Sequence, residues 1–192
     1  MSAATRSRLL FRDVNRRGDP DYDPGLQRHH ILPRQIAGRA CFGTMFDDIG
    51  RQSVGFDDFR CNGLLLPCDE PAAVRFGLPL HRGPHWNYNA LVAERVGRIE
   101  SDWSRARLHD PLRAIVEARM RLALLQGALR RFLLGRCKLR LRLNTRDPAG
   151  IAADFSDLDA LVDSLWGVTD PGQTEEASAV DPVRSESARS AA

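Results

Sequence analysis

The chain is nearly free of lysine, holds few cysteines and lacks any long apolar run. Lys138 is the one lysine among 28 basic residues, a bias that genomic base composition can produce and that carries little weight. No CxxC pair occurs among the four cysteines, Cys41, Cys61, Cys68 and Cys137, which argues against a zinc ribbon and against a dense disulfide framework. No stretch approaches the roughly 20 apolar residues that span a bilayer, which argues against a membrane anchor and a cleaved secretion signal.

These absences predict a cytoplasmic protein with reduced thiols and no membrane partner, while export by a route without a cleaved signal stays open. The composition is 43% hydrophobic and 28% charged, which is typical of a soluble chain that folds. A length of 192 residues suits one compact domain with terminal segments, because domains usually contain about 100–200 residues. No internal repeat is visible, which argues against a solenoid.

Charge is unevenly distributed along the chain, although the net charge is only +3. Residues 104–146 contain twelve Lys/Arg against Asp110 and Glu117, a local charge of +10, whereas residues 147–192 carry a local charge of −8. A basic block attracts phosphate backbones without reading their sequence, and a nearby acidic segment can compete with them. A solvated helix face is the alternative interpretation of the basic block.

The predicted organisation has four parts: a polar N-terminal lead-in over residues 1–25, a core domain over 26–103, a basic helical extension over 104–166 and a disordered acidic tail over 167–192. Gly, Pro and Asp in GDPDYDPG favour turns, so the core domain is expected to begin near Leu26. The tail is poor in apolar residues and rich in Ser, Ala and charge, which is typical of disorder.

Short strands or irregular loops are expected over residues 26–79, because Gly and Pro interrupt short apolar runs such as HHILP and CNGLLLP. Little regular structure is predicted there. Helical spacing of apolar residues follows the Gly-Pro pair at 83–84 and continues to about Trp103. The segment KLRLRLNTR at 138–146 alternates as a half-exposed strand does, with a continuing helix as the alternative, and 154–166 has the pattern of a short acidic amphipathic helix.

A second helix is predicted to start after Asp110, an N-cap residue followed by proline, and to end near Gly135. A helix in a globular protein buries its apolar stripe against the rest of the fold. The predicted stripe contains Leu112, Ile115, Val116, Met120, Leu124 and Leu125.

Four of the five histidines fall between residues 27 and 89, in RHHILP and LHRGPHWNYN, with Asn62 between them in CNGLLLP. Imidazole binds borderline divalent metals and titrates near neutral pH, so such a cluster can supply both metal ligands and a general base. His29 and His30 would point to opposite sides of an extended segment, so that one can hold a metal while the other faces a water.

The second pair, His81 and His85, is separated by Gly83 and Pro84. We therefore expect His81 to precede the helix and His85 to lie in its first turn, from where both can reach one ion. For any single histidine, the alternative to a functional role is a structural one, as a surface or core residue whose hydrogen bonds are satisfied. His109 lies outside both pairs, beside the start of the second helix, and is expected to be structural or solvent-exposed.

Together, HHILP, NGLLLP and LHRGPHWNYNALVAERV resemble the AHH family of HNH nucleases, in the His-Me finger (treble-clef) superfamily with endonuclease VII. The resemblance covers about residues 26–100. Its combination of a paired histidine, a central Asn-Gly and HxGxHxxYN is more specific than any single motif. Arg28 stands where the family name has alanine, and the segment from Asn62 to His81 is long.

The resemblance implies an α+β fold with a small ββα-metal core, additional helices and a mostly helical C-terminal half. It implies that one divalent ion is held by His29, His81 and His85, with Mg²⁺ as the first expectation and Mn²⁺, Ni²⁺ and Zn²⁺ as alternatives. His30 would be the general base that activates water. Asn62 would orient the base-bearing loop through side-chain hydrogen bonds, a simple turn residue being its alternative.

The aromatic residues beside the second histidine pair, Trp86 and Tyr88, would flank this site. Core packing is expected for at least one of them, because aromatic side chains bury large apolar areas.

The function implied is hydrolysis of phosphodiester bonds by a metal-dependent endonuclease that acts on DNA, with RNA as an open alternative. A bacterial toxin effector with an immunity protein as its partner, a free-standing nuclease and a phage-defence component all stay open. A non-catalytic, metal-stabilised nucleic-acid-binding module is the alternative from another class, and an interaction protein built on the helix at 111–135 is a third. His30→Ala distinguishes the endonuclease from the binding module, because it would abolish activity only in a nuclease. A closed structural metal site needs no general base.

Overall fold

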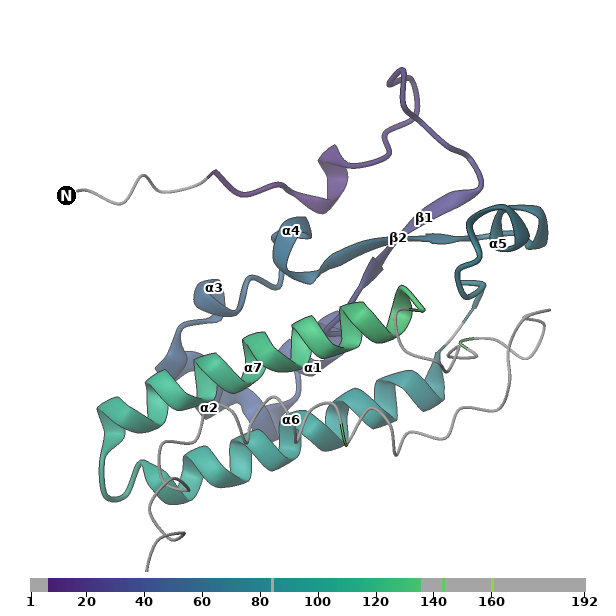
Figure 1. Ribbon diagram of the computed structural model, residues 1–192. Helices are drawn as coiled ribbons and strands as arrows, with labels where there is room; N and C mark the ends of the chain where they lie inside the picture. The colour runs from purple at the N-terminus through teal and green to yellow at the C-terminus, as the bar shows by residue number, and fades with distance from the viewer. Residues whose placement is uncertain (1–6, 84, 136–142, 144–159, 161–192) are drawn as a thin grey trace, which may run out of the picture.

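The computed structural model describes residues 7–83 and 85–135 of the chain, together with residues 143 and 160 (Figure 1). The elements are η1 (Phe11–Asp13), β1 (Leu26–His30), α1 (Arg34–Ala37), α2 (Ala40–Ile49), α3 (Arg51–Val54), α4 (Phe59–Asn62), β2 (Gly63–Pro67), α5 (Glu70–Phe76), α6 (Trp86–Ala106) and α7 (Pro111–Leu133). The fold is α+β, as predicted. Among the described residues, no helix combines the length and apolar character that a membrane crossing requires.

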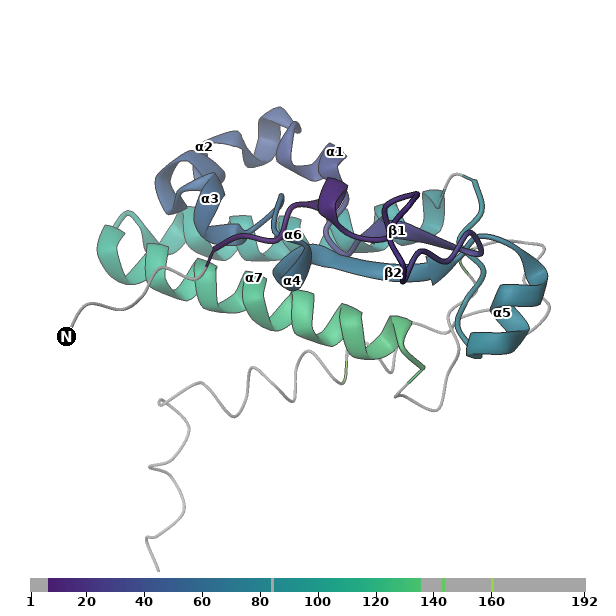
Figure 2. The same cartoon turned by 90° about the horizontal axis from the view of Figure 1, so that it is seen from above.

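The strands β1 and β2 pair antiparallel, with His29 opposite Leu64 and His30 opposite Gly63. The two strands fall where the sequence predicts short strands. Gly63 is required at the start of β2, since a Cβ atom there would lie 2.1 Å from the ring of Phe59. Figures 1 and 2 show the sheet beside the end of the helical hairpin at which α6 begins and α7 ends.

The prediction of little regular structure over residues 26–79 is wrong, because the two strands and the helices α1 to α5 occupy most of this range. In α2 the buried residues are Phe42, Met45, Phe46 and Ile49, which follow the spacing of one helix face. For α5 the Asp69 side chain accepts a hydrogen bond from the backbone N–H of Ala72, and a proline occupies the first turn. Short helices therefore lie where the sequence predicts loops.

The hairpin of α6 and α7 confirms both predicted helices. The first begins at Trp86, directly after the Gly-Pro pair, and the second begins at Pro111 after Asp110, whose side chain accepts a hydrogen bond from the N–H of Arg113 at 3.0 Å. His109 lies exposed in the turn between them, as expected. Both helices pack against α2 and against each other around buried aromatic and aliphatic side chains.

The predicted apolar stripe of α7 is confirmed only in part: Leu125 is buried and Ile115 packs against the core, whereas three other members are exposed. Leu112, Val116 and Met120 are 78%, 65% and 37% exposed. The buried face instead carries Ala114, Ala118, Leu122, Leu125, Gln126, Ala128, Leu129, Phe132 and Leu133. Alanine side chains are small and let two helix axes approach closely. The prediction favours larger apolar side chains, several of which lie on the neighbouring face of the helix.

The N-terminal segment from residue 7 to residue 25 packs against the sheet and α4. The N–H of Phe59 donates to the carbonyl of Leu9 at 2.7 Å, and Leu10 forms a β-bridge with Asp58. The Asn15 side chain donates to the carbonyl of Leu26 at 2.9 Å. This segment therefore brings its own side chains to the outer side of β1. The segments predicted at 138–146, 154–166 and 167–192 lie outside the described residues, apart from Leu143 and Ala160.

Candidate functional site

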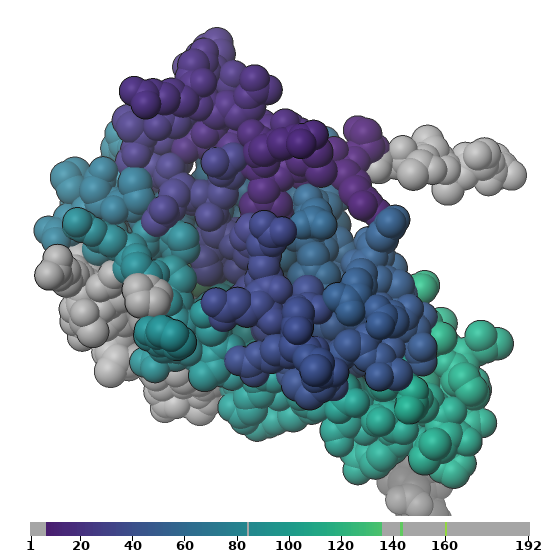
Figure 3. Space-filling view, turned by 180° about the vertical axis from the view of Figure 1, so that it is seen from behind, coloured from purple at the N-terminus to yellow at the C-terminus, as the bar shows by residue number. Residues whose placement is uncertain are grey.

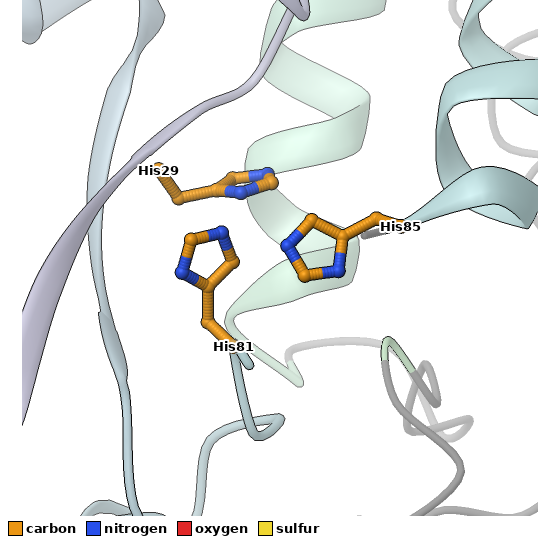
Figure 4. Close-up of side chains that lie close together, drawn as sticks. All are labelled: His29, His81 and His85. Atoms are coloured by element: carbon orange, nitrogen blue, oxygen red, sulfur yellow. The ribbon is translucent and has the colours of Figure 1, made fainter. Parts of the chain in front are cut away.

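Three histidines from distant parts of the sequence converge on one point. His29 lies on β1, His81 follows α5, and His85 is the N-cap residue of α6 (Figure 4). Their ring centroids lie 4.7 Å apart for His29 and His81, 4.4 Å for His81 and His85, and 5.8 Å for His29 and His85. One nitrogen of each lies within 4.8 Å of the others.

The position of His81 is fixed by both strands. Its backbone N–H donates to the carbonyl of Pro67 on β2 at 2.7 Å, and its carbonyl accepts a hydrogen bond from the Gln27 side chain on β1. The chain then turns at Gly83, whose φ of +83° favours glycine, and reaches the start of α6. The sheet thus positions His81, and the following turn brings His85 to it.

The three imidazoles are held neutral. Burial, followed by the charges of His81 and His85, lowers the pKa of His29 well below its usual range, and His29 is only 4% exposed. Burial lowers the pKa of His81 to about 4, with the charge of His85 as the next cause. Burial also lowers the pKa of His85, against a smaller opposite effect from the carbonyl of Leu143. Neutral imidazoles present the lone pairs that a metal ion needs.

The donor atoms of this cluster fit a metal ion. The Nε2 atom of His29 and the Nδ1 atom of His81 are buried and lack a hydrogen-bond partner. Buried polar atoms without partners are rare, and a coordinated ion would satisfy them. The Nδ1 atom of His85 lies 3.4 Å from the carbonyl of Leu143, which leaves its Nε2 atom for the ion. The three predicted ligands are therefore brought together, with nitrogen lone pairs available.

His30 lies apart from this cluster, as the alternation of a strand requires. Its half-buried ring stacks on Phe11, with centroids 3.7 Å apart and planes 4° apart. Phe59 supports Phe11 from the edge at 5.1 Å. Burial lowers the pKa of His30, the charge of Arg34 lowers it further, and the charge of Asp57 raises it. His30 is thus a neutral imidazole able to accept a proton.

Asn62 is fully buried and holds the segment that follows His30. Its Oδ1 atom accepts from the N–H of Leu32 at 2.7 Å, and its Nδ2 atom donates to the carbonyl of Leu32 at 3.0 Å. Its backbone carbonyl accepts from the N–H of Ile31 at 2.8 Å. Asn62 therefore anchors the two residues after the histidine pair and touches neither histidine ring through these bonds.

The two aromatic residues at the start of α6 differ in environment. Tyr88 is buried, its ring lies 5.2 Å from the ring of His29, and its hydroxyl donates to the carbonyl of Ile31 at 2.6 Å. Trp86 is 75% exposed. The expectation that at least one of them packs in the core is confirmed for Tyr88.

Two residues of the site escaped the sequence analysis. Phe11 is a single aromatic residue in a segment interpreted as a lead-in, and Gln27 acts through the backbone carbonyl of His81, which only the fold brings near it. The aromatic character of Phe11 was the one available signal. Cys41, Cys61 and Cys68 are free thiols, as predicted for these three.

Much of the described part of the basic block is engaged inside the fold. Arg121 pairs with Asp102 and with Glu117, both at 2.6 Å. Arg119 donates to the carbonyl of Ile49, and Arg130 donates to the carbonyl of Arg60. These guanidinium groups join α7 to its neighbours, so fewer of these side chains are free to reach a phosphate backbone than the sequence suggests.

The fold and the site define a small α+β protein able to hold a divalent metal through three imidazoles, with a fourth imidazole on the outer side of the same strand. A family model described as AHH, a nuclease family of the HNH/ENDO VII superfamily with conserved AHH, matches residues 10–118. The chain belongs to this family. The matched range contains the three clustered histidines and His30, together with Asn62 and Phe11. No curated protein and no solved structure matches the chain.

Proposed function

We propose that this protein is a metal-dependent endonuclease that hydrolyses phosphodiester bonds of DNA, with RNA as the alternative substrate. The observation that carries the proposal is the convergence of three neutral imidazoles, His29, His81 and His85, beside a fourth on the same strand. In this proposal β1, β2 and α6 act as a ββα-metal unit, in which the strand and the helix start supply ligands from two sides.

His29, His81 and His85 would hold the ion. A metal ion so bound stabilises negative charge on the scissile phosphate and on the leaving oxygen. Three nitrogen donors suit borderline ions such as Zn²⁺ and Ni²⁺, and also Mn²⁺, better than Mg²⁺, which prefers oxygen ligands and retains several waters. The donor set therefore ranks Mg²⁺ last, although it is the first expectation from the sequence.

His30 would act as the general base. The lowered pKa leaves its imidazole deprotonated at neutral pH, so it can take a proton from the attacking water. Asn62 would position this base through the Ile31 and Leu32 backbone, and Tyr88 would assist through the Ile31 carbonyl. Substrate contacts made mainly to phosphates would give weak sequence preference.

Within this proposal, a role as a bacterial toxin effector adds an immunity protein as partner. A nuclease with weak sequence preference damages any nucleic acid that it reaches, so the producing cell would need such an inhibitor. The inhibitor would have to block either the three-histidine cluster or the surface around His30.

The test is cleavage of a plasmid and of a structured RNA by the purified chain with Zn²⁺, Ni²⁺, Mn²⁺, Mg²⁺ or EDTA. We expect cleavage that needs a metal ion and is lost in His30→Ala and in His85→Ala. Metal binding, measured by calorimetry, should persist in His30→Ala and weaken in His85→Ala. A folded wild-type protein that binds metal and nucleic acid but cuts neither substrate would instead be a non-catalytic, metal-stabilised binding module.

A further inference from the structure

A cavity of about 300 Å³ lies on the side of the molecule where the N-terminal segment meets α1 and α3. Its lining includes Arg8, Arg34 and Arg51, together with Asp57, Asp58 and the backbone at Gly38 and Gly55. In the view of Figure 3 the N-terminal segment, in purple, borders the blue surface formed by the segments that follow β1. The family description assigns nothing to this cavity.

Most of the charged groups in the cavity wall are already used by the fold. Arg51 pairs with Asp47 at 2.8 Å, and Arg8 donates to the Gln52 side chain at 3.0 Å. Asp58 accepts hydrogen bonds from the backbone N–H groups of Leu9 and Arg60. These groups therefore shape the cavity and have little capacity left for a ligand.

Two wall residues differ from the rest. Within the described part of the chain, the exposed side chains of Arg34 and Asp57 form no hydrogen bond or ion pair. Both are close enough to His30 for their charges to act on its pKa in opposite directions. The open charges of the cavity thus lie within electrostatic range of the imidazole proposed as the base.

We infer that this cavity binds one unpaired nucleotide of the strand being cut, with Arg34 on its phosphate and Asp57 on its base or sugar. A guanidinium binds phosphate oxygens through paired hydrogen bonds, and a carboxylate accepts hydrogen bonds from base amino groups and sugar hydroxyls. The volume is at the lower end of small-ligand sites, which suits a single nucleotide. The inference rests on the proposed function and names its substrate class.

The substrate would accordingly be single-stranded or locally opened nucleic acid. A base within a duplex is stacked and paired, so it must leave the helix before it can enter a cavity. A single strand offers unstacked bases without that step. Placement of this nucleotide near His30 would also position the scissile phosphate relative to the proposed base.

The test of binding uses the full chain without metal, so it does not depend on cleavage. The amide signals of Gly38 and Gly55 are followed by NMR during titration with deoxycytidine monophosphate, deoxycytidine or inorganic phosphate. We expect saturable shifts of both signals with the nucleotide, weaker effects with each fragment, and about tenfold weaker nucleotide binding in Arg34→Ala. Arg39→Ala is the matched control, because Arg39 is exposed nearby but does not line the cavity, and it should bind as the wild type does.

The inference is overturned if neither glycine signal moves, if inorganic phosphate alone reproduces the nucleotide affinity, or if Arg34→Ala and Arg39→Ala bind equally. Cleavage supplies an independent arm: Arg34→Ala should raise the KM for a single-stranded oligonucleotide about tenfold over Arg39→Ala. If the chain binds the nucleotide but cleaves no substrate, the proposed nuclease activity is refuted and the proposed nucleotide site is not. Cleavage without nucleotide binding would refute the site alone.

Discussion

Acid should destabilise the metal-free protein by protonating histidines that the fold keeps neutral, and His81 is the clearest case. Its pKa is lowered from 6.5 to about 4 by burial and by the charges of His85 and His30. A histidine with a lowered pKa in the folded state takes up a proton more readily in the unfolded chain. Its stabilising effect is therefore complete above pH 6.5 and is lost as the pH falls from there towards 4.

The size of the effect follows from the same two values. The difference between 6.5 and about 4 corresponds to roughly 3 kcal/mol of unfolding free energy. His81 keeps partial access to water, so a contribution of about 2 kcal/mol is the better expectation. His29 is more deeply buried and adds to the loss in the same direction.

The assay is urea unfolding in EDTA at a series of values between about pH 7.5 and pH 4.5, followed by circular dichroism. His81→Gln should flatten the pH dependence by about 2 kcal/mol relative to the wild type. His109→Gln, which alters an exposed histidine in the turn before α7, is the control for the substitution itself. The slope is compared rather than the stability at one pH, because His81→Gln also changes packing. An equal slope in His81→Gln and wild type would refute the reasoning.

Three further predictions follow from the site. Phe11→Ala should lower the single-turnover cleavage rate about tenfold, because the ring that fixes His30 at 3.7 Å is lost, and Phe11→Tyr should restore it; equal rates in both variants would exclude a stacking role. Asn62→Ala should lower the unfolding free energy in urea by about 2–4 kcal/mol, since two buried backbone groups of Leu32 lose their partners, and a loss below about 1 kcal/mol would contradict this. Zn²⁺ at about a hundred times its Kd should stabilise the wild type by about 2.7 kcal/mol in thermal melting, and a similar gain in His85→Ala would argue against the three-histidine site.

Local signals in the sequence were enough to predict the helical hairpin and to single out the histidines that the fold brings together. Asp110 and the proline after it mark a helix start through backbone chemistry that acts within a few residues. The histidine pairs were identified from residue type and spacing, and the fold brings His29, His81 and His85 together. Such features can be recognised without knowing which parts of the chain pack together.

What escaped prediction depends on long-range packing. The buried face of α7 is set by how closely α6 approaches, so alanines at 114 and 118 lie inside while Leu112 and Val116 lie outside. The stack of Phe11 on His30 joins residues nineteen positions apart across a segment without regular spacing. No local pattern encodes either contact, because each depends on a partner chosen by the tertiary fold.

Both strands hold the His81 backbone, so in this chain folding does not have to wait for metal binding. In many small metalloproteins the two events occur together. Classical zinc fingers are unfolded until the ion arrives. Here the hydrophobic core spans α2, α6 and α7 without the three histidines, and the strands already hold the His81 backbone. The metal-free chain is therefore expected to stay folded. Under the proposed function, its activity would depend on the supply of the ion, and chelation would stop cleavage without unfolding the protein.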